Sequence, residues 1–284
     1  MIKIIADSTC DIGATLAHRY DIDILPLNII LDDKSVLDGE MSQAELFKWA
    51  DDNAKTPKTA ALALDVAVEL LSKYKDDDII AFTISSEMST SHNVMRIAAE
   101  EAGCRSIRVI DSRNLSTGIG LLVLHAADMA GEGATIDEIA ESLNELIPRV
   151  RASFVIDTLT YLQRGGRCSP LTAMAANLLS LKPMIVVENG VMGVSKKYRG
   201  KISRVIEGYV NDLEPALRHA DKRRVFITHT LQGDTLHIAD DVATKLRAMD
   251  IFDEVHITTA GGVISSHCGP GTLGVLFIDS GAAE

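Results

Sequence analysis

The sequence predicts an α/β protein of two domains, with a mostly parallel sheet in the first domain and a mixed sheet in the second. The chain has 284 residues, of which 46% are hydrophobic, and this is enough for two cores. Short β-rich runs alternate with longer helical patterns up to about residue 150. The pattern changes beyond that point, so the predicted domains span residues 1–150 and 151–284.

The first domain shows the alternation most clearly. Apolar runs predict strands at residues 2–6, 24–31, 77–84 and 106–111. Helical patterns follow near residues 42, 91 and 135. Ser42 and Thr135 are each followed three residues later by a glutamate, which is the spacing of a capping box at a helix start.

The second domain is predicted to contain more strands than helices. Asn189-Gly190 is a strong hairpin signal inside the run at 182–200. Strands are predicted at 152–159, 224–230, 252–260 and 273–279, and helices at 169–181 and 234–249.

Charge and cysteine content exclude several classes of protein. The net charge of −12 repels nucleic acid and anionic lipid headgroups, so neither is an expected partner. Four cysteines lie far apart without a C-x-x-C, which indicates reduced thiols in the cytoplasm. The chain begins as a strand rather than a signal peptide, and no apolar run approaches the roughly 18 residues of a membrane span. A lipid would therefore be bound without stable membrane insertion.

The stretch SSHCGPGTLG at 265–274 has G-x-G-x-x-G spacing. A dinucleotide site needs a strand before these glycines and a helix after them, whereas a strand-like run follows here. Two interpretations remain: a turn that needs glycine conformations, or a loop beside a ligand with His267 at its entrance. A nucleophile pair of His267 and Cys268 is disfavoured, because sequence neighbours rarely face each other as catalysis requires.

The stretch ISSEMSTSHN at 84–93 concentrates five hydroxyl side chains between a predicted strand and a predicted helix. Hydroxyls and free amides at a helix start can bind an anion, and the alternative is an ordinary helix cap. The stretch contains no Lys or Arg, so a carboxylate fits better than a triphosphate. Ser86 and Ser89 are the candidates here, and Thr59 lies on another loop at the same expected sheet edge.

Other polar residues have simpler explanations. Asp7, Ser8 and Thr9 follow the first strand, and a helix cap is favoured over catalysis there. His229 ends a predicted strand and is expected to pack or cap. The eight histidines are scattered, and no pair has a clear metal-ligand spacing.

Two basic segments are candidate contact sites. Arg164 and Arg167 flank two glycines at 165–166, either as a helix C-cap with Gly165 at its left-handed position or as an exposed contact loop. Arg199, within KKYRGK at 196–201, either ends a strand or faces an acidic ligand.

Taken in order, these segments resemble the DegV family of fatty-acid-binding proteins, which are subunits of bacterial fatty acid kinase. The resemblance covers nearly the whole chain. Each motif is weak alone, but their order along the chain makes the match specific. The segments that carry it are ADSTCD, DIDILPLNIILDD, ISSEMSTS, YLQRGGR, YRGK and HCGPGTLG.

The resemblance implies a long-chain fatty acid buried between the two domains, with no catalysis by this chain and no cofactor. It implies carboxylate ligands at Thr59, Ser86 and Ser89, with Arg199 and His267 nearby. A separate ATP-dependent fatty acid kinase would phosphorylate the carboxylate, and Arg164 and Arg167 match the segment that meets it. One departure is that Ala60-Ala61-Leu62-Ala63 follows Thr59 where the family often has Ser-Gln-Pro-Ser.

Two other functions remain open from the residues alone. An acyl- or phosphoryl-transfer enzyme would use the serine stretch with His267, and would need a base within reach of Ser86 or Ser89. A lipid-sensing regulator would bind the same ligand without a kinase partner.

Overall fold

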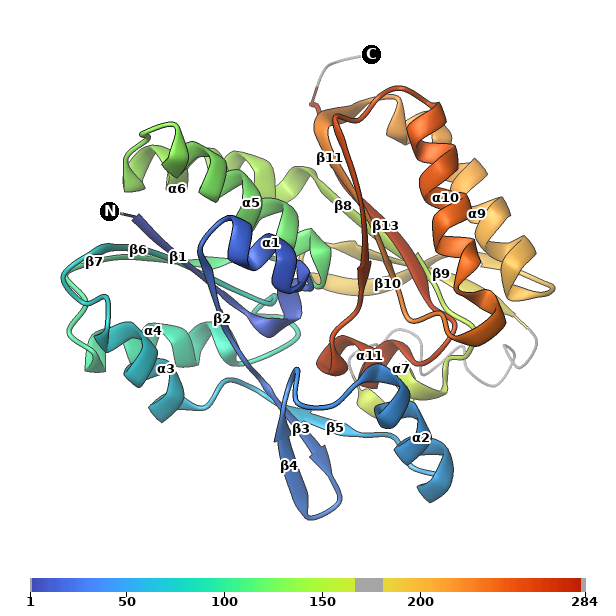
Figure 1. The fold of residues 1–284 in the computed structure, drawn as a ribbon, viewed down its shortest axis with the longest axis horizontal. Helices are drawn as coiled ribbons and strands as arrows, with labels where there is room; N and C mark the ends of the chain where they lie inside the picture. The colour runs from blue at the N-terminus through green and yellow to red at the C-terminus, as the bar shows by residue number, and fades with distance from the viewer. Residues whose placement is uncertain (1, 167–180, 282–284) are drawn as a thin grey trace.

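Three β-sheets with helices on their faces make up the computed structural model, which describes residues 2–166 and 181–281 (Figure 1). The first sheet has the order β2-β1-β6-β7, the second β10-β9-β8-β13-β11-β12, and a small third sheet β4-β3-β5. The predicted α/β class, with one parallel and one mixed sheet, is confirmed.

The first sheet is wholly parallel. Its central strands are almost fully buried, as expected when helices cover both faces. Helices α1, α5 and α6 lie on one face and α3 and α4 on the other (Figure 1). The strands are β1 (Ile2–Asp7), β2 (Ile22–Leu25), β6 (Asp78–Thr83) and β7 (Ser106–Asp111). The helices are α1 (Gly13–Arg19), α3 (Leu64–Ser72), α4 (Ser91–Glu101), α5 (Thr117–Gly131) and α6 (Ile136–Leu146).

The small antiparallel sheet corrects the prediction of one strand over 24–31. β2 ends at Leu25 in the parallel sheet, and β3 (Asn28–Leu31) starts a different sheet with β4 (Lys34–Leu37) and β5 (Lys58–Ala60). Pro26 separates them, since it has no amide hydrogen to continue a ladder. The helix after this hairpin, α2 (Gln43–Asn53), starts with the predicted capping box of Ser42 and Glu45, and α6 has the other.

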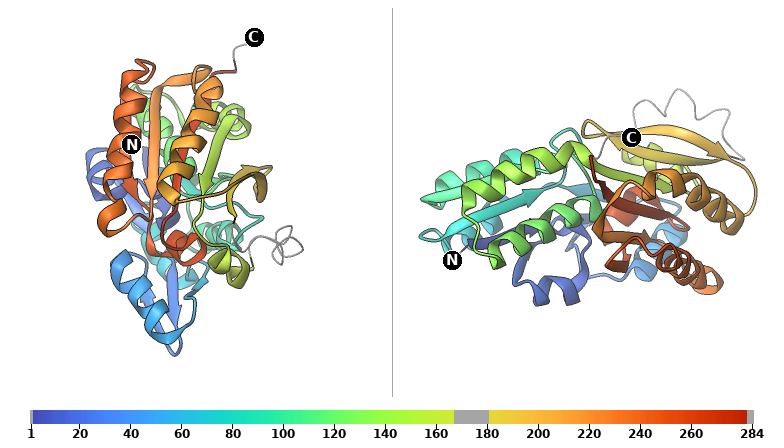
Figure 2. Two further views of the ribbon diagram at one scale, coloured as in Figure 1. Left: turned by 90° about the vertical axis from the view of Figure 1, so that its right-hand side faces the viewer. Right: turned by 90° about the horizontal axis from the view of Figure 1, so that it is seen from above.

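The second sheet is mixed: β11 and β12 are parallel, and the other neighbouring pairs are antiparallel. Asn189 and Gly190, at φ 52° and 83°, form the predicted hairpin turn between β9 and β10. α10 and this hairpin lie at opposite sides of the sheet (Figure 2). The elements are β8 (Val150–Val155), β9 (Lys182–Glu188), β10 (Val191–Tyr198), β11 (Ala220–His229), β12 (Glu254–Thr259), β13 (Leu273–Asp279), α9 (Ile202–Leu217) and α10 (His237–Ala248). The helix predicted over 169–181 falls almost wholly outside the described residues.

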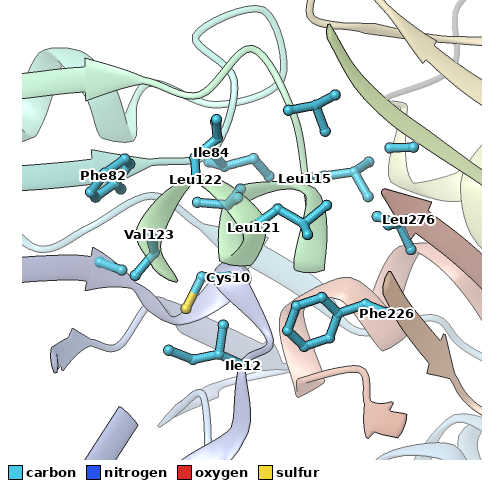
Figure 3. Close-up of a cluster of buried hydrophobic side chains, with 14 of the residues drawn as sticks. Cys10, Ile12, Phe82, Ile84, Leu115, Leu121, Leu122, Val123, Phe226 and Leu276 are labelled. Atoms are coloured by element: carbon cyan, nitrogen blue, oxygen red, sulfur yellow. The ribbon is translucent and has the colours of Figure 1, made fainter. Parts of the chain in front are cut away.

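Helix α5 lies between the parallel and mixed sheets and joins their cores. Leu121 and Leu122 lie between Phe82 of β6 and the side chains of Phe226 and Leu276 from β11 and β13 (Figure 3). Nine of the fifteen residues of α5 are buried, as expected for a helix with apolar neighbours on more than one side. One apolar core therefore runs from the first sheet into the second.

Candidate functional site

Thr59 and His267, which are 208 positions apart in the sequence, meet in a hydrogen bond of 2.8 Å between Oγ1 and Nε2. Thr59 lies in β5, where it pairs with Ile29 of the neighbouring strand. His267 lies in the last turn of α11 (Gly262–Cys268). Both side chains are half-buried, so the pair joins the interior to solvent.

Close packing explains two of the glycines around His267. A Cβ on Gly165, the last residue of α7 (Thr160–Gly165), would lie 2.3 Å from Nδ1 of His267. A Cβ on Gly269 would lie 2.6 Å from the ring of Tyr161, and its φ of 74° also favours glycine. The left-handed cap of α7 is Gly166, so the expectation that Gly165 would fill that position is wrong by one residue. Position 165 requires glycine because a side chain there would collide with the imidazole of His267.

The Gly-rich loop follows a helix and leads into a strand, since α11 precedes it and β13 follows. This is the reverse of the strand–loop–helix order that a dinucleotide site requires. The sequence-based rejection of a nucleotide fingerprint is confirmed, and the loop serves to place α11 and its histidine.

A cavity of about 50 Å³ lies directly inside the Thr59–His267 pair. Among the residues that the structure describes, Thr59, Ser89 and His267 are its polar lining, and the rest of the wall is apolar. That wall is formed by Leu27, Ala60, Ala61, Ile84, Met88, Leu115, Met192, Val263, Ile264 and Cys268. The cavity has a polar end and an apolar remainder, which suits an amphipathic ligand with one small polar group.

A second cavity of about 20 Å³ continues toward the mixed sheet. It shares Leu115, Ile264 and Cys268 with the first cavity and extends to Phe154 and Leu276. These three side chains therefore stand between the two spaces. The lining of the second space also includes the polar residues Ser116, Thr228, His229, Thr230 and Thr272.

The serine stretch divides between the cavity and the surface. The Ser89 hydroxyl lines the cavity, lies 2.9 Å from that of Ser91, and accepts a hydrogen bond from the Ser91 amide at the start of α4. Ser86 is exposed, and its hydroxyl donates to the carboxylate of Asp111. The structure brings Thr59, Ser89 and His267 together and leaves Ser86 on another face of the turn.

The two predicted basic residues that the structure describes, Arg164 and Arg199, lie outside the cavity. Arg199 is exposed after β10 and does not line it. Arg164 is exposed in α7 and lines an open groove that also includes Lys58, Thr59 and His267. The groove meets the cavity at the Thr59–His267 pair, because these two residues line both. Arg167 lies outside the described residues.

Buried carboxylates near the site perform capping, as predicted for Asp7. Asp7 accepts from the backbone amides of Thr9 at 3.1 Å and Ile84 at 2.8 Å. Burial raises the pKa of its carboxyl to about 6, and these hydrogen bonds oppose the rise. His229 also behaves as expected: it is buried, and its Nδ1 accepts from the Leu231 amide. Burial lowers the pKa of that imidazole.

Two further carboxylates, Asp11 and Asp38, were not found by sequence reasoning. They accept hydrogen bonds from the amides of Gly261 and Gly262 at the start of α11. Burial raises the pKa of both carboxyls. Their partners are more than 200 residues away, so no local pattern marks them.

Within residues 2–166 and 181–281, no helix is both long and apolar enough to cross a membrane. The same part of the chain contains no group of three His, Cys, Asp or Glu side chains placed to hold a metal ion.

The fold and the cavity define a class: an α/β protein of two large sheets and one small sheet, with a mostly apolar internal space closed by a hydroxyl–imidazole pair. A family model described as an uncharacterised protein of the DegV family matches residues 1–280. The chain belongs to the DegV family.

Three relatives show how similar the chain is to known members. A DegV domain-containing protein of Caldanaerobacter subterraneus subsp. tengcongensis is 33% identical over 97% of this chain and 98% of its own. A protein of Thermotoga maritima named fatty acid-binding protein is 29% identical, over 96% of each chain. A crystal structure from Thermotoga maritima, described as a DegV lipid binding protein, matches 98% of each chain with a TM-score of 0.84 and 28% identity.

Proposed function

We propose that this protein binds one long-chain fatty acid and presents its carboxylate to a separate ATP-dependent fatty acid kinase. The observation that supports this most directly is the cavity with Thr59, Ser89 and His267 at one end and apolar side chains elsewhere. The names of two relatives from Thermotoga maritima, as a fatty acid-binding and a lipid binding protein, agree with it. In this proposal the chain is a carrier without a cofactor.

The polar end supplies the donors that a buried carboxylate needs. A hydroxyl can donate one hydrogen bond and accept others, so Thr59 can accept from His267 and still donate to a ligand. Ser89 provides a second hydroxyl on the same cavity. An unpaired carboxylate would pay a large desolvation cost in such a place.

The alkyl chain would run past Leu115, Ile264 and Cys268 into the second cavity. Each buried methylene contributes about 0.8 kcal/mol, so a long chain binds strongly if it is fully enclosed. A cavity of about 150 Å³ accommodates benzene, whereas the two cavities here measure about 50 Å³ and 20 Å³. The walls must therefore move apart to admit a long acyl chain. Met88 and Met192 are suited to this, because methionine side chains adapt their shape easily.

The outer groove gives a kinase a route to the carboxylate. Thr59 and His267 are reached from the groove on one side and from the cavity on the other. A partner seated in the groove would meet Arg164 at its edge. Arginine is enriched at protein interfaces, so Arg164 is proposed to contact the kinase, as is Arg167 of the same sequence motif.

The test is extraction of the purified protein with organic solvent, followed by mass spectrometry. We expect about one long-chain fatty acid per chain, or uptake to that level when fatty acid is added. Incubation with ATP should give acyl-phosphate only when the kinase is present. A protein that neither carries nor takes up fatty acid would rule out the carrier function, and acyl-phosphate formed without the kinase would identify an enzyme.

A further inference from the structure

Helix α11 forms most of the cavity wall that comes from the C-terminal part of the chain, and Met192 of β10 adds to it. Val263, Ile264, His267 and Cys268 all line the cavity, and all lie within its seven residues. The chain joins this helix to β12 and β13 of the mixed sheet. Any displacement of α11 therefore moves the imidazole and three wall side chains together.

The beginning of α11 is held by two carboxylates from the N-terminal part of the chain. Oδ1 of Asp11 accepts from the Gly261 amide at 2.8 Å, and Oδ1 of Asp38 accepts from the Gly262 amide at 2.7 Å. Each carboxylate is fixed through its other oxygen: Ser116 donates to Asp11 at 2.6 Å, and Ser8 donates to Asp38 at 2.8 Å.

The packing around these bonds leaves little freedom. A Cβ on Gly262 would lie 2.4 Å from the Ile29 side chain, and one on Gly261 would lie 3.0 Å from the Asp11 carboxylate. Gln43 adds a third tie, because its amide donates to the carbonyl of Ala260 and to the Ser265 hydroxyl.

The other end of α11 is also attached to the N-terminal part of the chain, through the bond of His267 to Thr59 in β5. A seven-residue helix is only about 10 Å long, so a shift at its first turn is transmitted to its last turn. Asp11 and Asp38 do not line the cavity themselves. Asp38 reaches two residues of its wall, because Oδ1 also accepts from the Val263 amide at 3.4 Å and its own amide donates to the Leu27 carbonyl at 2.8 Å. The bonds to Gly261 and Gly262 act on the cavity through the position of the helix.

We propose that Asp11 and Asp38 are positioning residues of the fatty-acid site, which hold α11 so that His267 faces Thr59 and the cavity wall stays closed around the ligand. This inference rests on the proposed fatty-acid binding. Loss of either carboxylate leaves a buried amide without its acceptor, and the helix then moves to find another one. The expected consequences are a displaced imidazole and faster release of the ligand.

The test compares Asp38→Ala with Asp38→Asn, which keeps an oxygen that can accept from the Gly262 amide. Release of cis-parinaric acid is followed by stopped-flow fluorescence, and the His267 ring is followed by NMR in the ligand-free protein. We expect Asp38→Ala to accelerate release by at least about tenfold, the equivalent of about 1.4 kcal/mol, and to shift the His267 ring signals. Asp38→Asn should restore both measurements most of the way.

Asp128→Asn is the matched control. Asp128 on α5 is a largely buried carboxylate that bonds Arg224 of β11, so its loss removes a contact of similar kind away from α11. The control should lower the melting temperature and leave the release rate and the His267 signals unchanged. Ser8→Ala, which removes one support of Asp38, serves as a milder variant if Asp38→Ala fails to fold, and should shift the same two measurements in the same direction.

Unchanged release and unchanged His267 signals in Asp38→Ala or Ser8→Ala, with only a lower melting temperature, would overturn the positioning role. The NMR measurement needs no ligand. A wild-type protein that binds no fatty acid would therefore reject the proposed function separately, while the His267 signals still report whether the carboxylates position the helix.

Discussion

Thr59 and Ser89 are the two hydroxyls that the structure places at the polar end of the cavity, and we expect each to hold the ligand carboxylate. A hydrogen bond to a charged group is worth about 1.5–3 kcal/mol, which corresponds to a loss of roughly 10- to 150-fold in affinity. Thr59→Ala and Ser89→Ala should each weaken fatty-acid binding by this amount, as measured by titration with a fluorescent fatty acid.

Ser86→Ala is the control for this pair, because its hydroxyl is exposed and bonded to Asp111. It should bind fatty acid like the wild type. Tenfold weaker binding in Ser86→Ala with normal binding in Ser89→Ala would show that Ser86, and not Ser89, holds the carboxylate.

The Asp7 carboxyl should give a distinct pH dependence. Burial raises its pKa to about 6, so the folded protein binds this proton more tightly than the unfolded chain does. Ionisation of Asp7 then costs stability, and its contribution to the free energy of unfolding rises as the pH falls from about 6 toward 4. A shift of about two pKa units amounts to about 3 kcal/mol.

Asp7→Asn removes this titration and makes the effect measurable. The free energy of unfolding of the wild type minus that of the variant should increase as the pH is lowered from 7 to 4, as measured in urea titrations. A difference that stays constant over this range would mean that Asp7 titrates alike in the folded and unfolded chains.

Sequence reasoning found some of these residues for reasons that are local. Asp7 is the last residue of β1 and caps the next turn, and a short polar side chain at that place is a known signal. Thr59 and His267 were expected near one site only through family resemblance. Ser86 and Ser89 are three residues apart in the same motif, and only the turn geometry separates their environments.

Among the elements, α7 and α11 pack so closely that Gly165 touches the His267 ring. Gly165→Ala should push the imidazole away from Thr59 and lower fatty-acid affinity. Overpacking of this kind also costs about 1–3 kcal/mol of stability, visible as a lower melting temperature. Gly193→Ala in β10, where a new Cβ meets nothing within 4 Å, is the control and should change neither measurement.

Wild-type affinity in Gly165→Ala would mean that the ring can move without consequence, and that His267 is dispensable for holding the carboxylate.

Most elements of the fold follow patterns visible in the sequence, and the exceptions have physical reasons. The parallel strands are continuous apolar runs because helices cover both faces of their sheet. The run at 24–31 is similarly apolar, yet its two halves belong to strands of two different sheets. The single proline of the run lies between these strands. The ties from Asp11 and Asp38 to α11 are long-range and have no local signature.

For the whole molecule, the groove beside α7 predicts a separation of binding from hand-off. Arg164 lines this groove and does not line the cavity. Arg164→Ala should keep its bound fatty acid and a near-normal melting temperature. Loss of an interface arginine can cost about 2 kcal/mol, roughly thirtyfold in partner affinity. Acyl-phosphate formation with the kinase should therefore slow sharply when the carrier is limiting.

Arg105→Ala is the matched control, because Arg105 is another exposed arginine, placed just before β7 at the edge of the parallel sheet. Its kinase-coupled turnover should equal that of the wild type. Equal turnover for Arg164→Ala at limiting carrier concentration would refute the docking role of this groove.

Helix α5 has a consequence for how the molecule can be divided. It packs against strands of both large sheets, and its apolar residues belong to a core that includes Phe82 from one and Phe226 from the other. A chain cut near residue 150 would carry α5 with one apolar side uncovered, and such a fragment should be insoluble when produced alone. Leu276 of β13 belongs to the same core. Both halves should therefore complete their folding only after β13 has been synthesised.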